Sequence, residues 1–373
     1  MLAIGLMSGT SLDGIDAALI ETDGEGLVTP LAFVGTDYSD EDRALLASAT
    51  ELALLFDDPG EHPLLDRAEA LLTRTHADAV AALLDKAGTA PRAIDVIGFH
   101  GQTVAHRPHK GWTWQLGDGA ALAQATGIDV VAGLRVDDVE AGGQGAPLLP
   151  IYHAALAAGM TLPVAVLNLG GVANITFIGA DGELAAFDTG PANGLVDSWV
   201  EAETGARFDD GGALAAAGRV DDAVLTAMLD HGFFELPWPK SLDRHDFTIQ
   251  PARGLSTADG AATLTAFTAA TVAEAIGQLP ARPTRLLVAG GGRRNPVMLS
   301  MIADRTGLVP EPTDCLGWNG DAVEAEGFAY LAVRSLKGLP ITFPGTTGVS
   351  HPITGGTRYP APRAGLSLRV VGG

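Results

Sequence analysis

The chain has little cysteine and little positive charge, and both shortages exclude classes of protein. Its 373 residues include one cysteine, Cys315, so no disulfide can form within the chain and a cytoplasmic location is expected. Lysine and arginine number 23 against 45 aspartates and glutamates, which gives a net charge of −22. So acidic a chain repels polyphosphate backbones, and we expect no binding to nucleic acid. A phosphate ligand would then need backbone N–H groups and a metal ion to hold it.

Long apolar runs are also missing. No stretch approaches the roughly 18 residues that span a bilayer. The N-terminus has no basic residue ahead of its apolar residues, so neither a membrane anchor nor an export signal is expected. Hydrophobic residues nevertheless make up 47% of the chain, which is typical of a globular protein. Two domains are expected, because a single core rarely grows beyond about 250–300 residues.

Two glycine-bearing turns lie within strand-like apolar runs. Residues 1–21 and 164–178 each contain a β-rich run, a turn of glycine and small polar residues, and a second β-rich run, which is the pattern of a hairpin. The tip of such a hairpin can point successive backbone N–H groups at one spot, as a phosphate requires. One hairpin in each half of the chain predicts a nucleotide held between two related domains.

The remaining periodicity indicates alternating strands and helices. Strands are predicted at residues 2–7, 16–21, 27–34, 94–99, 128–132 and 286–289, and helices at 63–86, 118–125, 257–279, 320–336 and from 296 onward. Thr257 is the expected N-cap of its helix. The glycine-rich residues 141–147 separate the halves, either as a linker or as a loop that lines the cleft.

Three acidic residues are candidates for chemistry. Asp13 and Asp16 flank Gly14 in the first turn, where Asp-Gly pairs commonly do no more than cap the turn. The alternative is that Asp13 holds the Mg²⁺ of a triphosphate, directly or through water. Asp188 opens a predicted loop, where it either caps the next helix or acts as a general base aimed into the cleft.

Other polar segments fit the walls of a ligand site. Residues 290–295 lack a full Gly-x-Gly-x-x-Gly pattern, so they indicate close packing or the approach of a purine or ribose. His100, Gln102 and Thr103 follow a buried strand with tryptophans nearby, as in a sugar-binding wall. Glu324 and Glu326 are two positions apart on a predicted helix, so at most one of them should face a ligand.

Taken together, these residues closely resemble those of the anhydro-N-acetylmuramic acid kinases, cell-wall recycling enzymes of the sugar-kinase/Hsp70/actin superfamily. The resemblance covers nearly the full length. The motifs that carry it occur in order at residues 5–16, 98–103, 115–118, 141–147, 168–175, 188–191, 239–241 and 290–295. Around residues 237–239 and 242–244 the chain departs from the family's usual pattern, so no ligand contact is assigned to that loop.

The resemblance implies an α/β fold of the two-domain, actin-like (ribonuclease H-like) ATPase type. Each domain would hold a mixed five-stranded sheet with flanking helices, and the ligands would bind in the cleft between the domains. The expected domains are residues 1–134 and 135–344, with a C-terminal tail of about 345–373 packed back onto the first. A homodimer is expected from the family alone.

The resemblance also implies a reaction. Asp188 stands at the family's catalytic position, where it would take a proton from water attacking the anomeric carbon of the 1,6-anhydro sugar. The released O6 would attack the γ-phosphate of ATP, giving N-acetylmuramic acid 6-phosphate and ADP. The partner is therefore a small amino sugar, and the cofactors are ATP and Mg²⁺.

Each motif then has an expected role in the site. The ATP phosphates are assigned to Gly9, Thr10, Ser11, Leu12, Asp13, Gly14, Asp16, Asn168, Gly170 and Gly171. The adenosine side is assigned to Gly290, Gly291, Gly292 and Asn295. The sugar is assigned to His100, Gln102, Thr103, Asp118, Asn174 and Glu324, and Mg²⁺ to Asp13.

Two other functions remain open. A kinase for an ordinary hexose would share the fold and need only a base for an alcohol, and it would phosphorylate open N-acetylmuramic acid as readily as the anhydro form. An actin- or Hsp70-like ATP-driven binding module would hydrolyse ATP indifferently to sugar. The absence of a separate peptide-binding domain and the presence of a sugar-wall segment favour a sugar kinase.

Overall fold

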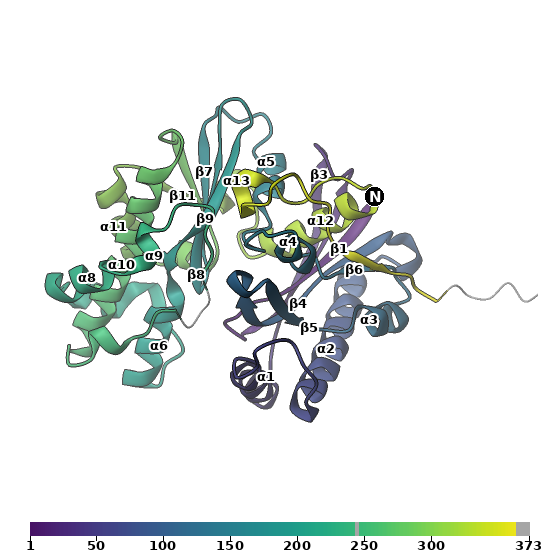
Figure 1. Ribbon diagram of the computed structural model, residues 1–373, viewed down its shortest axis with the longest axis horizontal. Coiled ribbons are helices and arrows are strands. Elements are labelled where there is room, and N and C mark those ends of the chain that lie inside the picture. Colours follow the sequence, from purple (N-terminus) through teal and green to yellow (C-terminus); the bar gives the residue numbers. More distant parts are fainter. Residues whose placement is uncertain (243–245, 363–373) are drawn as a thin grey trace, which may run out of the picture.

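The computed structural model describes residues 1–242 and 246–362, which form two sheets with helices on their faces (Figure 1). The strands are β1 (Leu2–Ser8), β2 (Gly14–Thr22), β3 (Val28–Asp37), β4 (Val96–Arg107), β5 (Trp112–Leu116), β6 (Val130–Ala132), β7 (Val164–Leu169), β8 (Val172–Ile178), β9 (Leu184–Pro191), β10 (Arg285–Ala289), β11 (Pro310–Pro312) and β12 (Thr357–Tyr359). The helices are α1 (Asp40–Ala53), α2 (Pro63–Ala87), α3 (Gly119–Thr126), α4 (Val136–Glu140), α5 (Pro150–Leu156), α6 (Asn193–Thr204), α7 (Ala213–Ala217), α8 (Asp222–Leu229), α9 (Gly232–Glu235), α10 (Thr257–Gln278), α11 (Pro296–Thr306), α12 (Val323–Leu336) and α13 (Pro344–Thr347).

The two sheets repeat one topology. The first has the order β12-β6-β4-β1-β2-β3 with β5 beside β4, and the second has the order β11-β10-β7-β8-β9. In both, the first three strands form an antiparallel meander. Two later strands run parallel to the first one, β4 and β6 in the first sheet and β10 and β11 in the second. This repeat confirms the expected two-domain actin-like fold and explains why the sequence carries two similar hairpins.

The first sheet is larger than predicted. Among the described residues it has seven strands instead of five. Strand β5 folds back antiparallel on β4, and the late strand β12 pairs antiparallel with β6. Residues 363–373 of the expected tail lie outside the described residues.

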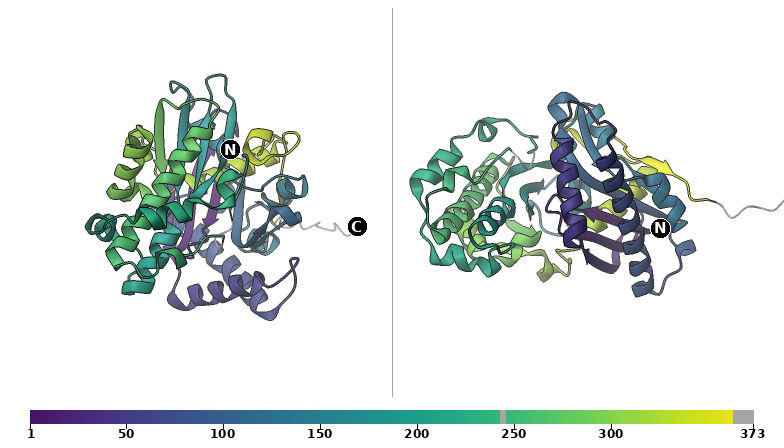
Figure 2. Two further views of the ribbon diagram at one scale, coloured as in Figure 1. Left: turned by 60° about the vertical axis from the view of Figure 1, so that its left-hand side comes forward. Right: turned by 90° about the horizontal axis from the view of Figure 1, so that it is seen from below.

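The central strands of the first sheet, such as β1, are buried on both faces because they alternate two apolar sets. Ile4 and Leu6 of β1 pack into the core under α1 and α2, whereas Ala3 and Met7 pack into the core under α12. Figure 2 shows α12 on the opposite side of this sheet from α1 and α2.

Helix α12 therefore covers the first sheet although it lies late in the sequence. A Cβ at Gly5 would lie 1.7 Å from the carbonyl oxygen of Ala325, and one at Gly98 would lie 2.0 Å from that of Phe328. Only glycine allows so close an approach between strand and helix backbones. The domain boundary after residue 134 stays a prediction. Helix α12 falls in the expected second domain, yet it packs on β1, β2 and β4 of the first sheet.

In the second half, α6 and α10 pack on one face of the sheet and α5 lies near the other. Helix α10 is capped by Ser256 and not, as predicted, by Thr257. Ser256 Oγ accepts from the N–H of Asp259 at 3.1 Å and donates to the Asp259 carboxylate at 2.8 Å. Thr257 could not form such a pair, because no acidic residue lies three positions after it. Within the described part of the chain, no helix has the length and apolar character to cross a membrane.

Candidate active site

The two hairpin tips meet at one cavity of about 230 Å³, as the sequence predicted for their positions. Gly9, Thr10 and Ser11 line it from the β1–β2 turn, and Gly170 and Gly171 from the β7–β8 turn. Thr10 Oγ1 lies 3.8 Å from where a Cβ on Gly171 would be. The cavity thus has one wall from each sheet.

The first tip is held in an unusual backbone shape. Leu12 has φ of 56°, in the left-handed region that side chains other than glycine rarely adopt. Its N–H donates to the carbonyl oxygen of Gly9 at 3.2 Å, and that oxygen also accepts from Gln102 Nε2 at 3.0 Å. Backbone strain of this kind persists only where the surroundings enforce it, and it gathers at ligand sites.

Asp188 lies on strand β9 and lines the same cavity with only 6% of its surface exposed. Its Oδ2 accepts from the N–H of Leu242 at 2.8 Å. It does not cap α6, whose N-cap is Ala192 without a side-chain hydrogen bond. The predicted loop is also wrong, because β9 continues to Pro191 and pairs Asp188 with Asn174 of β8.

Burial raises the pKa of Asp188 to about 7, because the ionised carboxylate loses water. The hydrogen bond from Leu242 and the positive charge of Arg135 act in the opposite direction and limit the rise. At neutral pH this carboxyl group is therefore divided between a form that accepts a proton and a form that donates one.

Arg135 is a site residue that the sequence analysis missed. It follows strand β6 and lines the cavity, where Nε donates to His100 Nε2 at 2.8 Å and Nη1 donates to the carbonyl oxygen of Gly145 at 2.7 Å. Burial lowers its pKa, while the carboxylates of Glu324 and Asp188 raise it. The sequence signal for Arg135 was its place just after the predicted strand 128–132. That strand, β6, runs parallel to β4, and the carboxyl ends of parallel strands meet at one edge of a sheet.

His100 lines the cavity as predicted, but both of its ring nitrogens are engaged by the protein. Nδ1 lies 2.6 Å from the carbonyl oxygen of Gly101 and so carries the proton, which leaves Nε2 to accept from Arg135. Burial, with the adjacent Arg135 charge, holds the pKa of His100 well below its usual value. The neutral ring orients the Arg135 guanidinium.

Glu324 and Glu326 face different ways, as their spacing predicted. Glu324 lines the cavity and accepts from Asn168 Nδ2 at 3.2 Å, and burial raises its pKa. Glu326 instead accepts from the hydroxyl of Tyr152 at 2.7 Å inside the core. The approach of α12 to β1 thus carries one carboxylate to the cleft.

Amide groups supply further polar atoms on the cavity wall. Gln102, Thr103 and Asn174 line it, and the buried oxygens Gln102 Oε1 and Asn168 Oδ1 have no hydrogen-bond partner among the described residues. Buried polar atoms of this kind are rare unless a ligand or water satisfies them. Asp118 is not among the lining residues: its Oδ1 accepts from the first amides of α3 and so caps that helix.

Acidic side chains gather beside the first tip. The pKa of Asp16 is raised to about 7, first by burial and then by the carboxylates of Glu324, Asp13, Asp321 and Asp37. This uncompensated negative charge suits a divalent cation, and Mg²⁺ commonly takes one or two protein carboxylates besides substrate phosphates. Within residues 1–242 and 246–362, no three His, Cys, Asp or Glu side chains form a ready-made cage.

Asp13 also makes the contacts of an ordinary turn. Its Oδ1 accepts from Ser11 Oγ at 2.7 Å and from the N–H of Gly14 at 3.0 Å. Among the described residues no hydrogen bond reaches the other carboxylate oxygen, Oδ2, so the turn contacts and a metal role are compatible.

The glycines at the end of β10 pack tightly on β7. A Cβ on Gly290 would lie 2.4 Å from Asn168 Oδ1, and one on Gly292 would lie 2.6 Å from Leu169 Cβ. Asn295 Oδ1 accepts from two amides and caps α11. Close packing thus accounts for two of these glycines, and an adenosine-side role for Gly290, Gly291, Gly292 and Asn295 stays a prediction.

The glycine-rich residues 141–147 line the cleft and are not a bare linker. Ala146 lines the cavity beside Arg135. The buried carboxylate of Asp138 holds the segment, since Oδ2 accepts from the N–H of Gly145 at 2.6 Å and Oδ1 accepts from Thr347 Oγ1 at 2.7 Å.

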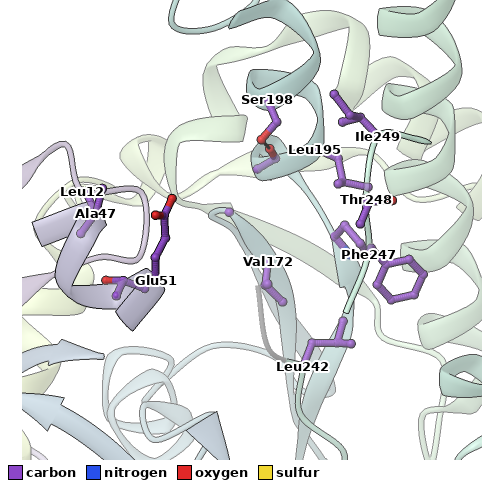
Figure 3. A pocket seen from close by; sticks show the side chains of 14 residues that line it. Leu12, Ala47, Glu51, Val172, Leu195, Ser198, Leu242, Phe247, Thr248 and Ile249 are labelled. Carbon is purple, nitrogen blue, oxygen red and sulfur yellow. Dashed lines mark hydrogen bonds between the residues drawn. The ribbon is translucent and has the colours of Figure 1, made fainter. Parts of the chain in front are cut away.

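A second cavity of about 360 Å³ adjoins the first and shares Thr50, Gly171, Val172 and Leu242 with it. Figure 3 shows Glu51 and Ala47 of α1 on one side, facing Ser198 of α6 and the segment with Phe247 on the other. The space beside Asp188 therefore continues into a second cavity between α1 and α6.

A family model and curated relatives agree on one family. A family model described as anhydro-N-acetylmuramic acid kinase matches residues 1–361. The anhydro-N-acetylmuramic acid kinase of Rhizorhabdus wittichii is 66% identical over 360 residues, covering 96% of this chain and 99% of its own. That of Zymomonas mobilis is 56% identical, covering 95% and 99%. A solved structure, (R)-2-hydroxyglutaryl-CoA dehydratase component A of Acidaminococcus fermentans, aligns with a TM-score of 0.49 and 12% identity over 89% of this chain and 99% of that one.

Proposed function

The chain belongs to the anhydro-N-acetylmuramic acid kinase family, and on that premise we propose how its cleft performs the reaction. Like those relatives, it is an anhydro-N-acetylmuramic acid kinase, which phosphorylates this sugar with ATP in cell-wall recycling. The finer proposal is that water opens the 1,6-anhydro bridge in the same site. The released O6 then takes the phosphoryl group, so that the products are N-acetylmuramic acid 6-phosphate and ADP.

The observation that carries this proposal is the state of Asp188. It is a buried carboxyl group with a pKa of about 7, in a cavity lined by both hairpin tips. A group whose pKa lies near the working pH is well suited to take a proton in the transition state. No lysine lines the cavity, and the two histidines that do, His100 and His106, have both ring nitrogens in hydrogen bonds with other protein groups.

In this proposal Asp188 takes a proton from water while the water oxygen bonds to C1 of the sugar. The C1–O6 bond breaks, and its electron pair stays on O6. That oxygen attacks the γ-phosphorus, and the bond to the β-phosphate oxygen breaks to release ADP. The positive charge of Arg135 favours the ionised form of Asp188, the form that takes the proton, and it also opposes the rise in the pKa of Glu324.

The ATP phosphates would lie between the tips, held by backbone N–H groups of residues 9–14 and 170–171. Asp13, with Asp16 near it, would hold Mg²⁺, which neutralises phosphate charge when bound. Adenosine would lie toward residues 290–295. The sugar would contact Gln102, Thr103, Asn174 and Glu324, which line the cavity with Asp188. The cytosolic location and the homodimer stay predictions.

The test is ADP release measured with the anhydro sugar, with open N-acetylmuramic acid and with no sugar. We expect rapid release only with the anhydro sugar, because the site is proposed to generate the O6 nucleophile by opening the bridge. Equal rates with the open sugar would favour an ordinary hexose kinase. Equal rates without sugar would favour an ATP-driven binding module.

The pH dependence of kcat/KM gives a second expected result. Asp188 must be ionised to take a proton, so kcat/KM should rise with pH up to about 7 and level off above it. Arg135→Gln removes a charge that lowers the pKa of Asp188, so the rise should move to higher pH. Arg358→Gln, at an exposed pair with Asp129, is the control and should leave the profile in place. A profile unmoved by Arg135→Gln would exclude Asp188 as its origin.

A further inference from the structure

One serine side chain bridges the two halves beside Asp188. Ser241 Oγ donates to Gln144 Oε1 at 3.1 Å and lies 3.3 Å from Nε2 of His106, which is on strand β4 of the first sheet. The residues on either side of Ser241 both contact the proposed base of the second sheet. The sequence around residues 237–244 predicted no ligand contact and did not indicate this bridge.

The hydrogens along this bridge have one consistent direction. The Ser241 hydroxyl has a single hydrogen, and Gln144 Oε1 can only accept, so Ser241 must accept from His106 Nε2–H. His106 Nδ1 is then an acceptor for the Thr113 hydroxyl at 3.0 Å, and Thr113 in turn accepts from Gln115 Nε2 at 2.8 Å. This series of hydrogen bonds therefore runs from β5 to Ser241 with one donor and one acceptor at every step.

The peptide groups next to Ser241 hold Asp188 at two points. The carbonyl oxygen of Lys240 accepts from the N–H of Asp188 at 2.9 Å, and the N–H of Leu242 donates to Asp188 Oδ2 at 2.8 Å. Lys240 is itself anchored, since its buried ammonium donates to the carbonyl oxygen of Phe233 at 3.1 Å. Ser241 is thus the point at which this segment is tied to the opposite half.

We infer that Ser241 is a positioning residue, which acts through Leu242 to orient the Asp188 carboxylate when the two halves are in contact. The inference rests on the proposed role of Asp188 as base. The Leu242 N–H fixes Oδ2, and so it decides how the other oxygen, Oδ1, is presented to the cavity. Without the tie to Gln144 and His106, that N–H would be free to shift with the loop, and small misplacements of a catalytic group cost large factors in rate.

The first test compares Ser241→Ala with wild type. We expect kcat with the anhydro sugar to fall about tenfold while KM for ATP stays within about twofold, because orientation and not nucleotide binding is lost. Ser241→Thr keeps a hydroxyl and should restore most of the rate. The control is Ser48→Ala, whose exposed hydroxyl bonds only within α1, and it should retain wild-type kcat.

The second test distinguishes a role of Ser241 in positioning Asp188 from a role in stabilising the fold alone. If Ser241 acts through Asp188, Ser241→Ala should cause no further loss in an Asp188→Asn background, measured by single-turnover kinetics. Losses that multiply would overturn the inference, as would wild-type kcat in Ser241→Ala. A fall in Tm that accounts for the lost activity would also overturn it. Failure of the proposed function is distinguishable, because wild type itself would then show no preference for the anhydro sugar.

Discussion

Asp188→Asn is expected to lower kcat with the anhydro sugar by about 10²–10⁴-fold, the range that removal of a positioned general base produces. Asparagine has nearly the same shape and still accepts a hydrogen bond from the N–H of Leu242, so the fold around β9 should persist. What it loses is the ability to take a proton. The measurement is ADP release under saturating substrate, with the circular dichroism spectrum and Tm recorded on the same sample.

The matched control is Asp118→Asn, which changes an aspartate that caps α3 and does not line the cavity. It should keep wild-type kcat and change stability by no more than about 1 kcal/mol, since asparagine is also a good N-cap. Near-native kcat in Asp188→Asn would exclude Asp188 as the base. A large loss of kcat in Asp118→Asn would return that residue to the sugar site.

Gly5→Ala should destabilise the protein by about 3 kcal/mol or more, the upper range for forcing atoms into a packed core. The added Cβ would lie 1.7 Å from the carbonyl oxygen of Ala325 and 2.5 Å from the backbone nitrogen of Ala329. Both neighbours are backbone atoms of α12, so the helix must move off β1. Because α12 carries Glu324 to the cleft, activity should fall with stability. Urea unfolding and thermal melting measure the change.

Gly26→Ala is the control for this substitution, because a Cβ at Gly26 meets no atom within 4 Å. Its stability should stay within about 0.5 kcal/mol of wild type. If Gly5→Ala were equally harmless, the backbone of α12 would not lie in direct contact with β1. The pair therefore tests the most unexpected contact in the fold.

Local signals in the sequence were enough for the two hairpins and for the long helices α2, α10 and α12. Glycine turns between β-rich runs predicted both hairpins, and their tips line one cavity. The spacing of Glu324 and Glu326 predicted that only one faces the cleft, because that depends on helix geometry alone. These predictions succeeded because each rests on interactions between residues near one another in the chain.

Predictions that depended on distant contacts were wrong or missing. Asp118 was assigned to the sugar wall, yet it follows β5, where its own helix amides satisfy it. Arg135 was overlooked because its role depends on His100, 35 residues away. The five-strand count for the first sheet was wrong because β12, from the far end of the chain, adds to β6, and because β5 folds back on β4.

By itself the sequence determined that the chain holds two related hairpins and that Asp188 is a candidate base, since turn chemistry and strand periodicity are local properties. Only the tertiary structure decided that Asp188 is buried and does not cap α6. It also decided that Asp188 accepts a hydrogen bond from the N–H of Leu242, 54 residues later in the chain. Burial and long-range hydrogen bonds set the pKa of a carboxyl group, and both arise from packing between segments that the sequence keeps apart.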